Sequence, residues 1–199
     1  MEIRRMSHDE RLTVSVALQA YGFEPSPASR STIERLRKNQ RYYKDNVTLV
    51  AEDKGVPLAE VSAVPMRQNV RNSVYPMAGV AGAATQPLAR RRGYVRTLLI
   101  ELLGQMRETG HALSALHPFR PSFYQRFGYV GIPKSRTVTF APSDFAELLH
   151  TELPGEVTWE RIGSGYDAYR NFTQQLLTQR HGFALLPDYL DHSPWSTVS

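Results

Sequence analysis

The sequence predicts a mixed α/β domain in which a central sheet is flanked by helices. Three observations lead to this fold class. The turn Asp53-Lys54-Gly55 separates two apolar runs, a pattern typical of a β-hairpin. A longer run over residues 74–85 is apolar and rich in glycine and alanine. Residues 91–109 then carry apolar side chains at helical spacing and are followed by Gly110, which favours the end of a helix.

The remaining segments complete the order βααβββαβαβ. Ser7 to Glu10 has the Ser-x-x-Glu form of a capping box, which marks the start of the first helix. From the N-terminus we expect a strand over 3–6, helices over 12–21 and 31–44, strands over 46–52, 57–66 and 74–85, the helix over 91–109, a strand over 112–116, a short helix over 121–126 and a strand over 129–140.

The organisation of the chain changes near residue 150. We expect one domain over residues 1–152, which ends with a helix over 143–150. Residues 153–199 are predicted to form a linker and the start of a second domain, with a strand over 157–162 and a helix over 166–178.

Composition narrows the classes of function. The 199 residues are 41% hydrophobic and 22% charged, which is ordinary for a globular protein. Cysteine is absent and the six histidines lack the spacing of zinc ligands, so no metal is expected. No apolar run approaches the roughly 20 residues of a transmembrane helix, and the first residues lack the apolar core of a signal peptide. We therefore expect a cytoplasmic protein with no membrane partner.

The net charge of +5 leaves a basic nucleic-acid-binding domain as an alternative. The basic residues are scattered, however, apart from Arg90–Arg92 and the segment 35–38. A nucleic-acid surface more often interleaves a basic stripe with aromatic side chains. We therefore expect no nucleic-acid partner.

The junction between the run at 74–85 and the helix at 91–109 carries Arg90–Arg92 and Gly93. Backbone N–H groups in the first turn of a helix lack intrahelical partners, and the helix dipole favours anions there. Glycine lets a ligand approach the backbone, and arginine binds phosphate oxygens with charge-assisted hydrogen bonds. The alternative is a solvated row of arginines, but cations at a helix N-terminus are unfavourable without an anion between them. The junction therefore predicts a pyrophosphate site.

Two segments resemble the GNAT (GCN5-related) N-acetyltransferases, in particular their Eis (enhanced intracellular survival) branch. Residues 83–85, with the following Arg-Arg-Arg-Gly-Tyr-Val at 90–95, resemble the Gln/Arg-x-x-Gly-x-Gly/Ala acyl-CoA motif, except that Val95 replaces the small last residue. The stretch ALSALHPFRPSFYQRFGYV, residues 112–130, resembles the Tyr-x-Arg-Phe-Gly-Tyr segment of the Eis branch. The resemblance covers about residues 1–150. It implies the GNAT fold and transfer of an acetyl group from acetyl-CoA to a primary amine of an aminoglycoside-like polyamine or a lysine side chain.

The same resemblance implies roles for single residues. The cofactor would be bound by the backbone of Ala83, Ala84 and Thr85 along the pantetheine arm, by Arg91, Arg92, Gly93, Tyr94, Val95 and Arg96 around the pyrophosphate, and by Phe119 and Arg120 across the slot. Tyr124 would be the general acid that protonates the departing thiolate. A tyrosine with an ordinary pKa near 10 is protonated at neutral pH and suits this role. Packing in an aromatic core is the alternative for Tyr124.

A general base is harder to find in the sequence. Residues 77–85 contain no Asp or Glu. His117 is a substitute base or a loop histidine, and Glu52 and Glu60 are weaker candidates that would otherwise face solvent. In the Eis branch the C-terminal carboxylate of a distant third domain is thought to serve, and members form rings, which implies a homo-oligomer. Residues 157–199 resemble the opening of the branch's second GNAT-like domain, so an acyl-CoA-binding module that needs further domains for catalysis is the alternative.

Overall fold

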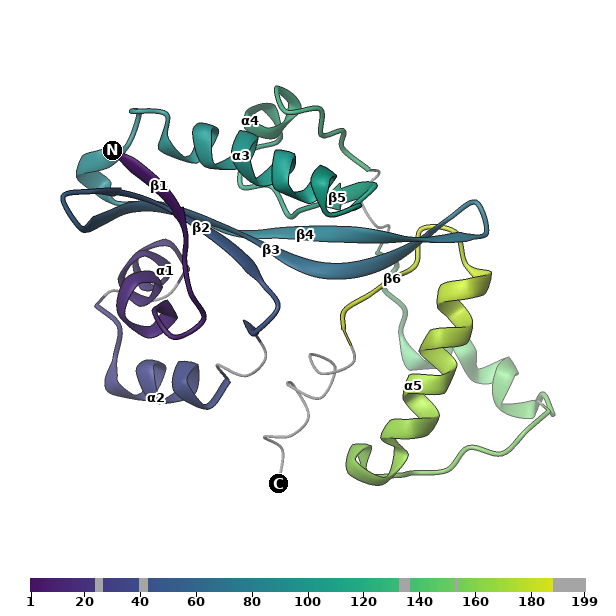
Figure 1. Ribbon diagram of the computed structural model, residues 1–199. Helices are drawn as coiled ribbons and strands as arrows, with labels where there is room; N and C mark the ends of the chain where they lie inside the picture. Colours follow the sequence, from purple (N-terminus) through teal and green to yellow (C-terminus); the bar gives the residue numbers. More distant parts are fainter. Residues whose placement is uncertain (24–26, 40–42, 133–136, 153, 188–199) are drawn as a thin grey trace.

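A single sheet organises the computed structural model, which describes residues 1–23, 27–39, 43–132, 137–152 and 154–187 (Figure 1). The described strands are β1 (Glu2–Arg5), β2 (Val47–Asp53), β3 (Val56–Val70), β4 (Ser73–Thr85), β5 (Leu113–Ala115) and β6 (Ala184–Leu185). Their order is β1-β2-β3-β4-β5, with β6 paired to β3. All pairs are antiparallel except β4 with β5.

Helices cover both faces of this sheet. The helical segments are η1 (Arg11–Ser15), α1 (Val16–Phe23), α2 (Arg30–Asn39), η3 (Pro87–Ala89), α3 (Tyr94–Glu108), α4 (Pro121–Gln125), η4 (Pro142–His150) and α5 (Ile162–Gln179). Figure 1 shows α3 and α4 on one face and α1 and α2 on the other. The first helical turn, η1, is π-helical, and Glu10 before it accepts a hydrogen bond from the Ser7 N–H at 2.8 Å, as one half of the predicted capping box requires.

The two faces of the sheet differ in polarity. On the α3 face, Leu49, Val61, Leu98 and Leu102 belong to one buried apolar cluster. Each such side chain stabilises the fold by about 1.5–3 kcal/mol relative to exposure. The α1 face is polar at its centre, and its buried polar side chains are Ser15, Thr48, Glu60 and Ser62. Polar groups buried in this way need internal hydrogen bonds, which fixes the helix against the strands.

The hairpin of β3 and β4 is longer than the sequence predicts at its turn end. β3 continues to Val70, and Val70 pairs with Ser73 across a two-residue loop. Arg71 and Asn72 in this loop both have positive φ, 52° and 66°, as a type I′ turn requires. Asparagine tolerates this conformation because its short side chain forms local hydrogen bonds.

The end of this hairpin holds the last described helix. Fully buried Asn69 donates from its amide to the carbonyls of Leu177 and Thr178 at 2.8 and 3.0 Å. Its side-chain oxygen Oδ1 accepts from the Asn72 N–H at 3.0 Å. β6 then pairs with β3 at Arg67 and Gln68. The division into domains 1–152 and 153–199 stays a prediction.

Two predicted strands are wrong within the described residues. Residues 129–132 and 137–140 form no strand, while residues 133–136 lie outside the described part. Residues 157–161 are also irregular, and α5 begins at Ile162. Val130 and Ile132 are 85% and 87% exposed, so no neighbouring strand covers them. Apolar composition favours a strand, but a strand also needs a partner for its backbone groups.

Two helix boundaries also differ from the prediction. α2 ends at Asn39, so the predicted helix over 31–44 is too long at Lys44, and residues 40–42 lie outside the described part. The helix predicted from Arg91 begins at Tyr94. Within the described residues, no helix is long and apolar enough to cross a bilayer.

Candidate active site

The junction before α3 leaves a row of backbone donors open. Gly93 caps the helix with φ 83°, and Arg91 also has a positive φ of 64°. The first helical hydrogen bond runs from the Thr97 N–H to the Gly93 carbonyl at 3.0 Å. Among the hydrogen bonds of the described residues, none uses an N–H group of residues 91–96 as donor. A Cβ built on Gly93 would meet nothing within 4 Å, so the space beside these donors is open.

The arginines of this junction have no acidic partner among the described side chains. Arg91, Arg92 and Arg96 are exposed and take part in none of the ion pairs found there. The Arg90 guanidinium lies 5.1 Å from the centre of the Tyr21 ring of α1. Tyr94 and Val95 instead pack in part against the core, so they offer only their backbone to a ligand. Uncompensated positive charge beside open N–H groups favours an anion.

The end of β4 has an unpaired edge. The pairing of β4 with β5 runs from Met77–Leu113 to Gly79–Ala115 and stops there. β4 continues to Thr85, so Ala83, Ala84 and Thr85 have no described strand on the β5 side, while Ala84 and Thr85 still pair with β3. Such an edge can pair with an extended ligand through main-chain hydrogen bonds.

A β-bulge shapes this edge. The register of β3 against β4 shifts between Glu60 and Ser62, so that Gly82 and Ala83 both lie opposite Val61. Gly82 has φ +65°, the left-handed conformation of the first residue of a glycine bulge. The bulge lies at the start of the predicted pantetheine stretch, and pairing with β3 resumes at Ala84.

Tyr124 is buried on the α3 face of the sheet. Its side chain is 5% exposed and belongs to the same apolar cluster as α3. The rings of Phe119, Phe123 and Tyr129 lie 5.5, 5.0 and 6.0 Å from its ring centre. Its hydroxyl takes part in none of the hydrogen bonds among the described residues. Burial, with a smaller contribution from Tyr129, raises the pKa of Tyr124 above its usual value, so it stays protonated at neutral pH.

Phe119 and Arg120 lie between β5 and α4. Phe119 is 70% exposed although its ring also contacts Phe123 at 5.3 Å. Arg120 is exposed at the N-cap of α4, whose first residue is Pro121. The structure therefore brings Phe119 next to Tyr124, and it places Arg120 at the entrance of the same short helix.

The two carboxylates considered as bases are engaged, so the expectation that they face solvent is wrong. Glu52 binds the Arg4 guanidinium with two hydrogen bonds of 3.0 and 2.8 Å. Glu60 is fully buried, accepts from the Ser15 hydroxyl at 2.8 Å and also accepts from the Gln19 amide. Burial raises the pKa of Glu60, although both hydrogen bonds and Arg11 oppose this shift. His117 is exposed in the loop after β5.

Sequence reasoning missed the part that α1 plays at the bulge. Gln19 donates to the Gly82 carbonyl at 3.1 Å and so joins Glu60 to the β4 bulge. Polar residues in an amphipathic helix are usually assigned to solvent, and only the buried Glu60 opposite them could have indicated otherwise. Among the described residues, no group of three or more His, Asp or Glu side chains could hold a metal ion.

Comparison with known proteins identifies the family to which the chain belongs. The acetyltransferase (GNAT) domain family matches residues 2–131, and the chain belongs to this family. Among curated relatives, the N-acetyltransferase Eis of Mycobacterium tuberculosis is 33% identical over 112 residues. That match covers 54% of this chain but only 27% of the relative, so this chain spans well under two thirds of Eis.

Solved structures support the same fold. A conserved protein of unknown function from Enterococcus faecalis V583 aligns with a TM-score of 0.56 and 26% identity over 64% of this chain and 31% of the other. A GNAT family acetyltransferase from Brucella melitensis, solved in complex with acetyl-CoA, aligns with a TM-score of 0.52 and 21% identity over 65% and 82% of the two chains. The mixed sheet flanked by helices, predicted from sequence, is confirmed as a GNAT fold, and its resemblance to the Eis branch is confirmed as well.

Proposed function

We propose that this chain transfers the acetyl group of acetyl-CoA to a primary amine. The observation that carries the proposal is the unpaired edge of β4, which leads from the bulge at Gly82 to the open N–H groups of residues 91–96. An extended pantetheine arm would pair with Ala83–Thr85, and its pyrophosphate would lie among Arg91, Arg92 and the N–H groups. The relative solved with acetyl-CoA has this fold, which supports the choice of cofactor.

In this reaction the neutral amine attacks the thioester carbonyl carbon, a carbon–nitrogen bond forms, and the carbon–sulfur bond breaks. The nitrogen loses one proton to water, and Tyr124 takes one back from water after each turnover. Tyr124 would give its proton to the sulfur as negative charge develops there, and its raised pKa keeps that proton in place beforehand. Phe119, beside Tyr124, would cover the cofactor on the side away from β4. Polyamine and lysine acceptors, a homo-oligomer and a cytoplasmic location stay predictions.

Cofactor binding is tested by calorimetry with acetyl-CoA. Replacement of Arg91 and Arg92 by alanine removes charge-assisted hydrogen bonds of about 1.5–3 kcal/mol each, so the dissociation constant should rise at least tenfold. Arg107→Ala, an exposed arginine in the last turn of α3, is the matched control and should leave binding unchanged. Equal affinity of the double variant and the control would overturn the proposed site.

Catalysis is tested by the release of free thiol from acetyl-CoA in the presence of primary amines. Tyr124→Phe removes the proposed acid without removing the ring, so kcat should fall about 100- to 10,000-fold while acetyl-CoA still binds. Acetyl-CoA binding without thiol release by any amine would instead identify an acyl-CoA-binding module. Unchanged kcat in Tyr124→Phe would remove Tyr124 from the reaction.

A further inference from the structure

The C-terminal half of α1 lies against the end of β4, on the face of the sheet opposite α3 (Figure 1). The Gln19 amide donates to the Gly82 carbonyl at 3.1 Å. A Cβ built on Gly22 would lie 3.5 Å from the Cβ of Ala84, so the backbone of the helix comes close to the strand there. α1 therefore contacts the strand that is proposed to bind the pantetheine arm at two positions.

A third contact joins α1 to the arginine junction before α3. The Arg90 guanidinium lies 5.1 Å from the centre of the Tyr21 ring. This distance is within the roughly 6 Å over which the face of an aromatic ring attracts a cation. Among the ion pairs of the described residues, none includes Arg90. In this part of the chain, the positive charge of Arg90 is therefore stabilised by the Tyr21 ring.

This contact lies where an anchored segment of backbone meets an open one. Before Arg90, the Gln86 N–H donates to the Leu58 carbonyl at 2.8 Å, which fixes the segment to β3. After Arg90, the backbone N–H groups that face the proposed diphosphate are open, and Arg91 has a φ of 64°. A residue with a Cβ rarely adopts this conformation, which persists only where neighbouring contacts hold it. The Arg90–Tyr21 contact is in a position to hold it.

We propose that Tyr21 is a positioning residue for acetyl-CoA, because its ring holds Arg90 against α1. With Arg90 held, the N–H groups of residues 91–96 and the guanidinium groups of Arg91 and Arg92 stay in place for the diphosphate. A loop that is ordered beforehand binds more tightly, since fewer groups lose freedom on binding. The inference rests on the proposed acetyl transfer, because it concerns the same acetyl donor.

The test measures dissociation constants for three ligands by calorimetric and NMR titration. These are acetyl-CoA, S-acetylpantetheine, which lacks the diphosphate and the nucleoside, and inorganic pyrophosphate, which is the diphosphate alone. From the strength of exposed cation–π pairs, we expect Tyr21→Leu to weaken binding of acetyl-CoA and pyrophosphate about two- to fivefold. S-acetylpantetheine should bind this variant and the native chain equally. Tyr21→Phe keeps the ring and should restore native binding of all three ligands.

A double-mutant cycle shows whether Tyr21 acts through Arg90. Arg90→Met removes an exposed guanidinium and should weaken binding of both diphosphate ligands at least as much as Tyr21→Leu. In the Arg90→Met background, Tyr21→Leu should have no further effect, because the contact is already absent. Should Tyr21→Leu fail to fold, Tyr21→Met repeats the cycle with a longer apolar side chain.

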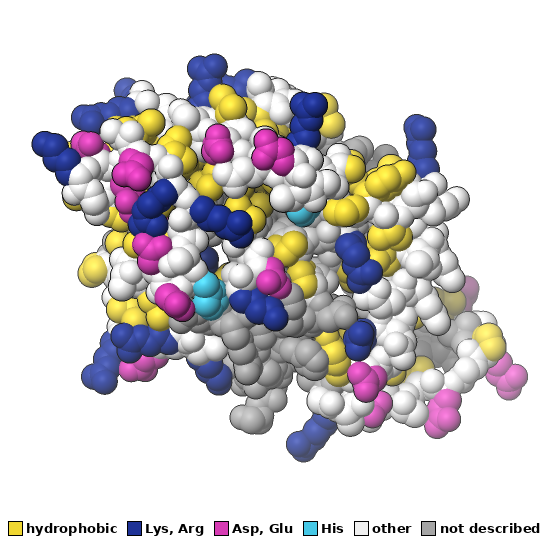
Figure 2. Space-filling view, viewed as in Figure 1, with side chains coloured by type: hydrophobic (Ala, Val, Ile, Leu, Met, Phe, Trp, Pro, Cys, Tyr) yellow, Lys and Arg dark blue, Asp and Glu magenta, His cyan; other side chains and the backbone are white. Residues whose placement is uncertain are grey.

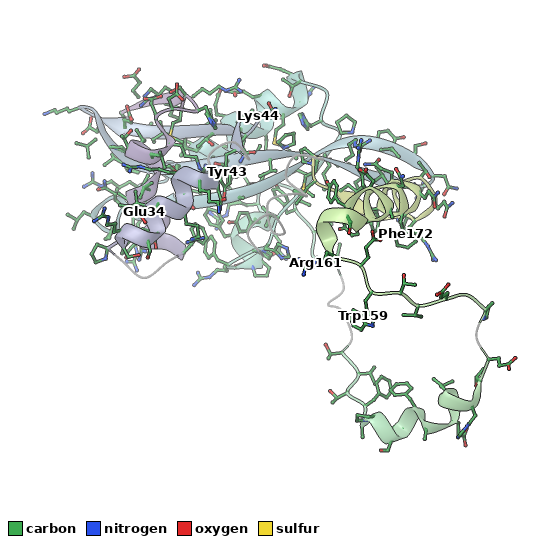
Figure 3. All side chains as sticks on the ribbon, turned by 90° about the horizontal axis from the view of Figure 1, so that it is seen from below. Glu34, Tyr43, Lys44, Trp159, Arg161 and Phe172 are labelled. Atoms are coloured by element: carbon green, nitrogen blue, oxygen red, sulfur yellow. The ribbon has the colours of Figure 1, made fainter. Side chains whose placement is uncertain are left out.

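Two exposed aromatic residues away from the junction serve as controls. Tyr75, towards the turn end of β4, is 40% exposed, close to the 38% of Tyr21. Figure 3 shows Phe172 on α5, on the other side of the molecule from Glu34 on α2. Tyr75→Leu and Phe172→Leu should leave all three dissociation constants unchanged.

Four results overturn the inference. Tyr21→Leu that binds acetyl-CoA and pyrophosphate as the controls do would exclude a role for the ring. Weaker binding of acetyl-CoA with unchanged binding of pyrophosphate would mean that Tyr21 contacts the nucleoside directly. An equal loss for S-acetylpantetheine would mean that Tyr21 acts on the strand or on the fold. A full effect of Tyr21→Leu in the Arg90→Met background would mean that Tyr21 does not act through Arg90.

Failure of the proposed function looks different. A chain that binds acetyl-CoA but releases no thiol with any primary amine is not an acetyltransferase, yet the binding comparisons still decide the role of Tyr21. A native chain that binds neither acetyl-CoA nor pyrophosphate would overturn both proposals.

Discussion

The side-chain amide of Gln19 donates a hydrogen bond of 3.1 Å to the carbonyl of Gly82, which joins α1 to the bulge of β4. The same amide donates to the buried Glu60 carboxylate of β3. One side chain therefore links a helix, a bulge and an ionisable group on the face that lies opposite α3. The position of the β4 edge depends on this link as well as on the pairing of β3 and β4.

Gly82→Ala should loosen this link. The left-handed φ of +65° costs a residue with a Cβ about 1–2 kcal/mol, and a Cβ there would lie 2.7 Å from the Gln19 amide nitrogen. We expect a loss of about 1–3 kcal/mol in the free energy of unfolding by urea, together with weaker acetyl-CoA binding. Gly104→Ala is the matched control, because Gly104 is an exposed residue of α3 where a Cβ meets nothing within 4 Å. It should be neutral or stabilising; equal effects of the two substitutions would contradict this account.

Glu60→Gln should change how stability depends on pH. Burial raises the pKa of Glu60 in the folded state above the ordinary 4.5 of the unfolded chain. Protons are then bound more tightly by the fold, so stability is full below about pH 4.5 and is lost as the pH rises through the folded pKa. Glutamine accepts the same hydrogen bonds without ionising, so the variant should be more stable than the native chain at pH 8.

Urea unfolding at several pH values measures this difference. The gap between Glu60→Gln and the native chain should close as the pH falls below about 4.5, where the carboxyl group is protonated in both states. Exposed Glu108→Gln controls for the loss of one negative charge. A gap that does not depend on pH would show that ionisation of Glu60 is not its cause.

Asn69→Ala should release the C-terminal end of α5. Three hydrogen bonds are lost, to the carbonyls of Leu177 and Thr178 and from the Asn72 N–H. At about 1 kcal/mol each, with a further cost for unsatisfied groups, we expect a loss of about 3–4 kcal/mol in stability. Asn171→Ala, an exposed asparagine on the same helix, should change stability by less than about 0.5 kcal/mol. Circular dichroism of both variants during urea unfolding makes the comparison.

Arg4→Met should raise the pKa of Glu10. The hydrogen bond from Arg4, and next the one from the Ser7 N–H, lower this pKa from 4.5 to about 2. A lowered pKa contributes stability above about pH 4.5 that is lost as the pH falls towards 2. Carboxyl NMR titration should therefore show the Glu10 midpoint moving up towards 4.5 in the variant. An unchanged midpoint would mean that the Ser7 N–H alone accounts for the shift.

The alternation of apolar runs and amphipathic helices was enough to predict the sheet and α3, because these elements follow local periodicity. The polar α1 face could not be predicted in this way, since Ser15 and Gln19 are held there by hydrogen bonds to Glu60, far away in sequence. The exposed apolar residues Val130 and Ile132 misled the prediction for a related reason. Local sequence does not tell whether a partner strand is present.

In the proposed site, too, features formed by consecutive residues could be predicted, and features formed by distant segments could not. Gly93 and the arginines before it are consecutive in sequence, so their position at the start of α3 could be predicted. Two cavities lined by Arg11 are formed by residues of η1, α2 and the chain before β2, and no sequence motif predicts them. Lys and Arg side chains on the face in Figure 2 are interspersed with Asp and Glu, so the positive net charge forms no single stripe on that face.

The turn end of the β3–β4 hairpin affects the order in which parts of the chain fold. α5 and β6 contact this hairpin through Asn69, Arg67 and Gln68, more than a hundred residues earlier in sequence. We therefore expect them to dock after the hairpin has closed. In the native protein this C-terminal unit should open by itself, so that its amides exchange with deuterium sooner than those of the strands beneath α3.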